Sequence, residues 1–94
     1  MAFARVATFE GVTAEHVDGL RKRIEESGQP EGMNATEFLV LFDPGTGKSV
    51  SVVLFDNEED YEKGSAILDG VNRDDAPGGR TSVERFEVPI RMSA

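Results

Sequence analysis

The sequence predicts an α+β fold in which four strands form one antiparallel sheet and two helices lie on one face of it, in the order β-α-β-β-α-β. The first observation is a pair of apolar runs, residues 38–42 and 50–55, joined by a turn with Pro44, Gly45 and Gly47. This pattern is typical of a β-hairpin. The second observation is that a helical segment and a strand-like segment lie on each side of this hairpin in the sequence. Right-handed crossovers then predict both helices on one face and a strand order of 4-1-3-2.

The size and charge of the chain limit what it can be. Its 94 residues are expected to form a single domain, 1–94, and 38% apolar with 30% charged residues is typical of a globular protein. A net charge of −8 opposes binding to nucleic acid or anionic lipid. The chain has no cysteine, no apolar run long enough to span a membrane and no signal-peptide pattern at its start. We therefore expect a cytoplasmic protein without disulfides, nucleic acid or membrane partners.

Four segments have the pattern of β-strands, at about residues 3–9, 36–43, 48–55 and 81–88. Period-two alternation places Arg5 on the same face of the first strand as Phe3 and Phe9. A charged group on a covered face must pair or contact a ligand. Arg5 is therefore expected either to form a cross-strand ion pair with Glu84 or Glu87, or to contact a ligand.

Two segments have helical spacing of apolar residues behind a capping residue. Thr13 is a good N-cap for the first helix, which Gly28 ends. Asp56 and Glu59 resemble a capping box at the start of the second helix, which is expected to run to about residue 71. The expected inner faces are Ala14, Val17, Leu20 and Ile24 on the first helix, and Tyr61, Ser65, Leu68 and Val71 on the second.

The segment Phe38-Leu39-Val40-Leu41-Phe42 is apolar on both faces and falls on an edge strand of the predicted sheet. A strand of this kind must be covered on both faces, and an uncovered apolar edge favours aggregation. Two helices cover only one face of the sheet. The sequence therefore predicts that a second copy covers the other face in a two-fold homodimer.

Two motifs that resemble ligand sites have simpler explanations. Residues 45–49, Gly-Thr-Gly-Lys-Ser, match the end of a phosphate-binding loop, but its first glycine is replaced by Phe42 and a strand follows instead of a helix. We interpret this segment as the hairpin turn. The acidic residues at 56–60 lack the spacing of a calcium loop and suit the start of a helix, so no metal site is predicted.

Three single residues are candidates for a role in a site. His16 is the only histidine and could carry a proton, although a partly exposed surface position is the favoured explanation. Tyr61 could orient a ligand or could cap the core with its hydroxyl in water. Gly64 lies inside the second helix at a cost of about 1 kcal/mol relative to alanine. Either a close contact or space for a ligand would explain this glycine.

The order and pattern of the elements resemble the dimeric α+β barrel superfamily, the antibiotic-biosynthesis-monooxygenase-like group with a ferredoxin-like fold. The resemblance covers residues 3–9, Val17/Leu20/Ile24, residues 38–55, residues 56–59 and residues 83–88. It implies two sheets packed face to face across a dimer, with a cavity between each sheet and its own two helices. Members include cofactor-independent monooxygenases of aromatic polyketides, haem-degrading enzymes and proteins of no assigned activity. The haem-degrading pattern of a strand-one Asn, a Trp and a His is not present in this sequence, so no catalytic residue is carried over.

The resemblance implies, as one of two hypotheses, a cofactor-independent, monooxygenase-like enzyme that acts on a small aromatic or apolar substrate. The alternative is a non-catalytic homodimer that binds a small molecule or has a structural role. An RNA-binding domain has the same element order, but the net charge and the apolar third strand argue against it. The candidate pocket residues are Arg5, His16, Phe38, Val40, Phe42, Tyr61 and Leu68, with Arg5 as the polar anchor.

Overall fold

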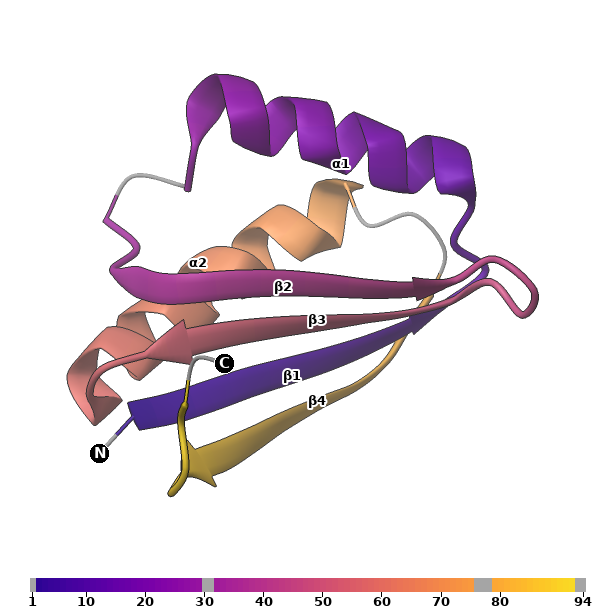
Figure 1. Ribbon diagram of the computed structural model, residues 1–94. Coiled ribbons are helices and arrows are strands. Elements are labelled where there is room, and N and C mark those ends of the chain that lie inside the picture. The colour runs from indigo at the N-terminus through magenta and orange to yellow at the C-terminus, as the bar shows by residue number, and fades with distance from the viewer. Residues whose placement is uncertain (1, 30–31, 76–78, 93–94) are drawn as a thin grey trace.

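The computed structural model describes residues 2–29, 32–75 and 79–92 and confirms the predicted order of elements (Figure 1). The strands and helices are β1 (Ala2–Glu10), α1 (Ala14–Ser27), β2 (Ala35–Asp43), β3 (Lys48–Phe55), α2 (Glu58–Asp75) and β4 (Gly79–Val88). The main difference from the sequence-based ranges is that α2 continues beyond residue 71. This is the ferredoxin-like arrangement.

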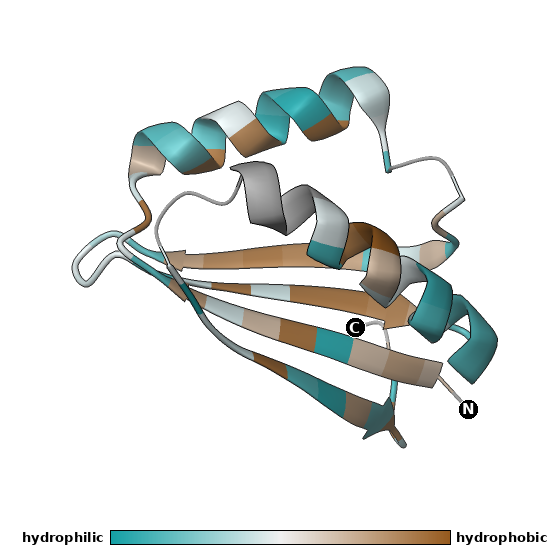
Figure 2. Cartoon of the chain, turned by 180° about the vertical axis from the view of Figure 1, so that it is seen from behind, coloured by the Kyte–Doolittle hydropathy of each residue, from teal (hydrophilic) through white to brown (hydrophobic). Residues whose placement is uncertain are grey.

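The four strands form one antiparallel sheet in the order β2-β3-β1-β4, so the predicted order is confirmed and β2 is an edge strand. Both helices lie on the same face of this sheet, α1 on the β2 side (Figures 1 and 2). The C-terminal segment crosses the other face, where Arg91 Nη2 donates to Glu37 Oε1 at 2.6 Å. The sheet therefore has a helix-covered face and a face that this chain covers only in part.

The register of the strands decides which side chains lie under the helices. Arg5 of β1 lies opposite Val53 of β3 and opposite Arg85 of β4. Phe38 of β2 also lies opposite Val53, so it shares the helix-covered face with Arg5. Leu39 lies on the face opposite to Phe38. The alternation predicted for β1 is therefore confirmed, whereas the face of Phe38 follows from the observed register.

Helix α1 is held mainly at its two ends. Thr13 is its N-cap, as predicted: its hydroxyl accepts from the backbone N–H of His16, and His16 Nδ1 accepts from the backbone N–H of Thr13. Val17 packs against the cluster that contains Val12, and the two residues occupy the positions of a hydrophobic staple. Gly28 ends the helix at a φ of 67°, a conformation that favours glycine. The structure describes all of α1, and no residue of this helix is buried.

Helix α2 has a different cap from the one predicted. The N-cap is Asn57 rather than Asp56: Asn57 Oδ1 accepts from the backbone N–H of Asp60 at 2.8 Å, and Asn57 Nδ2 donates to Asp60 Oδ2. The predicted box of Asp56 and Glu59 is therefore wrong by one residue. Asp and Asn are both good N-cap residues, so the pattern alone did not distinguish the two registers.

The larger part of the core lies between α2 and the sheet. It consists of Met33, Val53, Phe55, Tyr61 and Leu68. The rings of Phe55 and Tyr61 meet edge to face, with centroids 5.7 Å apart. A smaller cluster of Ala7, Phe9 and Val12 lies where β1 runs into α1. The core is therefore dense under α2, whereas α1 buries none of its own side chains.

Candidate functional site

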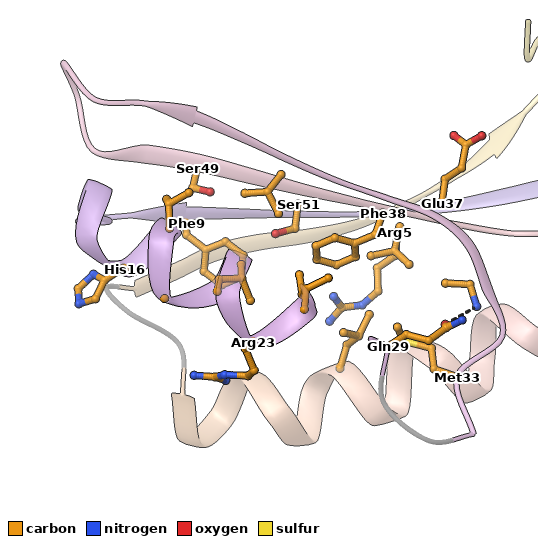
Figure 3. A pocket seen from close by; sticks show the side chains of 18 of the residues that line it. Arg5, Phe9, His16, Arg23, Gln29, Met33, Glu37, Phe38, Ser49 and Ser51 are labelled. Carbon is orange, nitrogen blue, oxygen red and sulfur yellow. Dashed lines mark hydrogen bonds between the residues drawn. The ribbon is translucent and has the colours of Figure 1, made fainter. Parts of the chain in front are cut away.

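A cavity of about 740 Å³ lies between α1 and the helix-covered face of the sheet (Figure 3). Ligand pockets of small molecules typically have volumes of ~300–1,000 Å³. The roof of the cavity is the inner stripe of α1 with Val17, Leu20 and Ile24, and its floor includes Phe38 and Val53. The wall is therefore mostly apolar, and it results from α1 standing away from the sheet instead of packing into it.

The structure brings five of the seven predicted pocket residues to this cavity, namely Arg5, His16, Phe38, Val40 and Leu68. The other two lie elsewhere. Phe42 packs against the cluster of Ala7, Phe9 and Val12. Tyr61 is buried in the core, where its ring lies near those of Phe3 and Phe55.

Arg5 is the charged residue buried most deeply in the described part of the chain, at 1% exposure. Its partner is not the one predicted, because Glu84 lies opposite Val6 on the open face and Glu87 lies opposite Phe3. Arg5 Nε instead donates to the Ser65 hydroxyl at 3.2 Å, and its Nη2 donates to Asp69 Oδ1 at 2.7 Å. The expected cross-strand ion pair is therefore wrong, since α2 supplies the partner.

Asp69 is shared between two cations. Its Oδ1 accepts from Arg5 Nη2 at 2.7 Å and from Arg80 Nη1 at 2.9 Å. Burial raises the pKa of Asp69, but hydrogen bonds and attraction from Arg80 and Arg5 together outweigh it and hold this pKa below its usual value. Arg5, Asp69 and Arg80 therefore form a cluster with one more positive than negative charge.

His16 lies at the rim of the cavity, in the exposed first turn of α1. Its Nδ1 is engaged with the backbone of Thr13. Figure 3 shows its ring turned away from the interior that Arg5 and Phe38 face. The position of His16 is thus explained by capping of the helix.

Two serines of β3 line the cavity and were not singled out from the sequence. Ser49 and Ser51 lie on the same face as Val53, and Ser49 is buried. The available signal was their period-two spacing in an otherwise apolar strand, which places polar groups on a face that the helices cover. Their hydroxyl groups can donate to or accept from a bound molecule.

The described residues contain no cluster of three or more His, Cys, Asp or Glu side chains that could hold a metal ion. Within the same residues, neither helix has the length and apolar composition to cross a bilayer. The glycine-rich segment at 45–49 is the hairpin turn, as predicted: Gly47 N–H donates to Asp43 O, and Gly47 O accepts from Val12 N–H. This turn ties the hairpin to the start of α1.

Two solved structures have the same fold over their whole length. One is a protein from Chloroflexus aurantiacus J-10-fl with the provisional name antibiotic biosynthesis monooxygenase, with a TM-score of 0.64 and 10% sequence identity. The other, from Deinococcus radiodurans, has the same provisional name, with a TM-score of 0.56 and 16% identity. Each alignment covers 100% of this chain and 98% of the other.

No protein-family model matches the chain, and no curated protein matches it. The structural likeness confirms the predicted ferredoxin-like fold. At these identities it defines the class of fold, and the activity has to be argued from the cavity.

Proposed function

We propose that the cavity under α1 is the binding site of a small aromatic or apolar substrate, which the protein oxygenates without a cofactor. The observation that carries the proposal is an apolar cavity of about 740 Å³ with one buried guanidinium, that of Arg5, in its wall. The names of the two structural neighbours support the reaction class.

The residues of the cavity have separate roles in this proposal. Phe38, Val40 and Leu68 bind the apolar body of the substrate by removing its surface from water. Arg5 stabilises an anion of the substrate, and Ser51 orients its polar groups. A low dielectric around the bound molecule strengthens both polar interactions.

The chemistry requires an electron-rich substrate, because no other electron donor is proposed. The substrate loses a proton to water, and the resulting carbanion or phenolate reacts with oxygen. A methylene group then becomes a carbonyl group: one oxygen atom of O₂ enters the product and the other leaves as water with the two methylene hydrogens. Stabilisation of the anion by Arg5 lowers the barrier to the first step.

The proposal includes a homodimer that forms through the open face of the sheet. Leu39 and Leu41 of the edge strand β2 are 50% and 55% exposed there, and Phe86 of β4 is 48% exposed. Apolar side chains gathered on one face mark an interaction surface. A second copy that presents the same face would cover these side chains.

Oxygen uptake with anthrone tests the proposed activity. Anthrone is an aromatic ketone with one activated methylene group, and its oxidation to anthraquinone consumes one O₂ and releases one water. We expect the protein to bind anthrone and to accelerate oxygen uptake above the rate in buffer. Ser51→Phe places a bulky ring inside the cavity and is expected to abolish both effects, whereas Ser27→Phe at the exposed end of α1 changes neither.

A non-catalytic binding protein is the second candidate, and the placement of two residues favours it. The ring of His16 is engaged in the N-cap of α1, and Tyr61 lies outside the cavity lining. Neither is therefore placed to exchange a proton with a bound molecule. Binding of anthrone that Ser51→Phe abolishes, without any acceleration of oxygen uptake, would support this candidate instead of the oxygenase.

A further inference from the structure

Arg5 has hydrogen-bonding capacity that the fold does not use. Its recorded hydrogen bonds engage Nε with Ser65 and Nη2 with Asp69. Among the described residues Nη1 forms no hydrogen bond, and no fully buried side-chain nitrogen or oxygen lacks a partner, so Nη1 keeps some contact with solvent. A guanidinium has five N–H donors, so Nη1 can still donate to an acceptor in the cavity.

The unused side of Arg5 faces the cavity. Arg5 lines the cavity, and Figure 3 shows its guanidinium extending into the space beside Phe38. Ser65 and Asp69 hold the group from the α2 side. The guanidinium is therefore fixed in orientation before anything binds, which reduces the entropy lost on binding.

The charges around Arg5 favour the binding of one more anion. Asp69 is the only carboxylate recorded as an ion-pair partner of Arg5 within the described residues, and Asp69 also pairs with Arg80. Among the described residues two carboxylates, those of Glu15 and Glu37, line the cavity, but both side chains are exposed. Glu37 pairs with Arg91 and is turned away from the interior in Figure 3. The local excess of one positive charge is thus not cancelled from within the cavity.

We propose that the substrate or ligand carries a single anionic oxygen group on its aromatic or apolar body, and that this group binds Nη1 of Arg5. This inference rests on the proposed function and specifies its substrate class. A carboxylate and an ionised phenol share the chemistry that a guanidinium recognises, because both offer charged oxygen acceptors. The chain's net charge of −8 does not attract anions from a distance, so selection of the anion depends on Arg5 itself.

A pair of probes of equal shape tests the inference. At neutral pH 2-naphthoate is an anion, whereas 2-naphthamide has the same ring and no charge. We expect calorimetry at physiological ionic strength to show roughly tenfold or tighter binding of the naphthoate, as is typical of charge-assisted hydrogen bonds. A third probe, 2-naphthol, distinguishes a carboxylate ligand from an ionised phenol. A naphtholate absorption spectrum on binding at neutral pH identifies an ionised phenol as a ligand.

Two arginine variants separate a direct contact from a general charge effect. Arg5→Met is expected to remove the preference for naphthoate over naphthamide. Arg85→Met removes the same charge at the position opposite Arg5 in the sheet, but Arg85 lies outside the cavity lining. We expect Arg85→Met to keep the preference. Asp69 keeps Arg80 as a partner when Arg5 is replaced, so the fold of Arg5→Met is expected to survive.

Arg5→Lys provides a second variant that keeps a charge at this position but loses the planar fork. It is expected to show a preference between those of the wild type and Arg5→Met. Equal affinity of the wild type for naphthoate and naphthamide would overturn the inference, while the cavity would remain a binding site. Equal losses of preference in Arg5→Met and Arg85→Met would also overturn it. Failure of the wild type to bind any of the three probes would overturn both this inference and the proposed function.

Discussion

Gly64 of α2 lies directly against the aromatic ring of Phe55 in β3, and a β-carbon at residue 64 would collide with that ring. This close contact, and not space for a ligand, explains why residue 64 inside the helix is a glycine. The missing side chain allows α2 to lie deep on the sheet, where Tyr61 and Leu68 are buried. Helix α1 has no such contact, and the cavity lies beneath it.

The first prediction concerns this close contact. Alanine is about 1 kcal/mol better than glycine inside a helix, so Gly64→Ala would stabilise the protein if the site were open. Because the added methyl group overpacks the core, we expect Gly64→Ala to lower the free energy of unfolding by about 2 kcal/mol. Gly70 of the same helix has open space at its β-carbon position, and Gly70→Ala is expected to raise stability slightly. Urea unfolding of both variants measures whether each free energy of unfolding rises or falls. A stabilised Gly64→Ala would contradict the packing described.

The second prediction concerns how weakly α1 is attached. Thr13→Ala removes the hydroxyl that caps α1, at a cost of about 1 kcal/mol. Since α1 buries no residue, we expect faster amide hydrogen exchange within residues 14–27 and little change in the sheet.

A matched variant in the other helix gives the control. Asn57→Ala removes the cap of α2, which is packed into the core. Asn57→Ala should therefore lower the free energy of unfolding of the whole domain. Equal exchange patterns in the two variants would show that α1 is as firmly packed as α2.

The third prediction is a dependence of stability on pH through Asp69. The pKa of Asp69 is lowered in the folded protein, so the folded state favours the ionised carboxylate. The stabilisation is complete above the unfolded value near 3.8 and is lost as the pH falls through the lower pKa of the folded state. We expect Asp69→Asn to be less stable than the wild type at neutral pH, because Arg5 then lacks its charged partner. This difference should shrink as the pH falls below about 4.

The measurement is denaturant unfolding across an acid series. Asp18 provides the control, because it forms an exposed pair with Arg21 in which both side chains lie mostly in water. Asp18→Asn is expected to change stability little at any pH. A gap between wild type and Asp69→Asn that stays constant through the acid range would contradict the role given to the ionised carboxylate.

Local patterns were sufficient to predict the elements and the alternation along β1. This alternation placed Arg5 on the face of Phe3 and Phe9, and the caps at Thr13 and Gly28 bounded α1 correctly. The register that brings Phe38 to the same face was not predicted. The bounds of an element and the alternation of its side chains depend on residues that are close in sequence. They can therefore be predicted wherever the apolar residues follow a strand or helix period.

The partner of Arg5 could not be predicted in the same way. Asp69 is 64 positions away in sequence, and the contact depends on how deep α2 lies and at which angle it crosses β1. Helical periodicity indicated that Tyr61 faces inward, but it did not indicate the distance of each helix from the sheet. Tyr61 lies in the core because α2 approaches closely at Gly64, whereas His16 is at the cavity because α1 does not.

The last prediction concerns the open face of the sheet. Leu41 is 55% exposed on the edge strand β2, and its neighbour Leu39 on the same face is 50% exposed. Exposed apolar side chains on a long edge strand favour association, and a two-fold pair of sheets would cover them without leaving an open end. We therefore expect light scattering to give twice the mass of the chain at micromolar concentration.

Leu41→Glu places a charge on the open face, where burial against a second copy would be costly without a partner of opposite charge. We expect this variant to be monomeric and soluble. Ala66→Glu adds the same charge on the exposed side of α2, away from the open face, and is expected to stay dimeric. A wild type with the mass of a single chain would contradict the homodimer. Such a result would also mean that the cavity, which lies on the other face of the sheet, forms without a second copy.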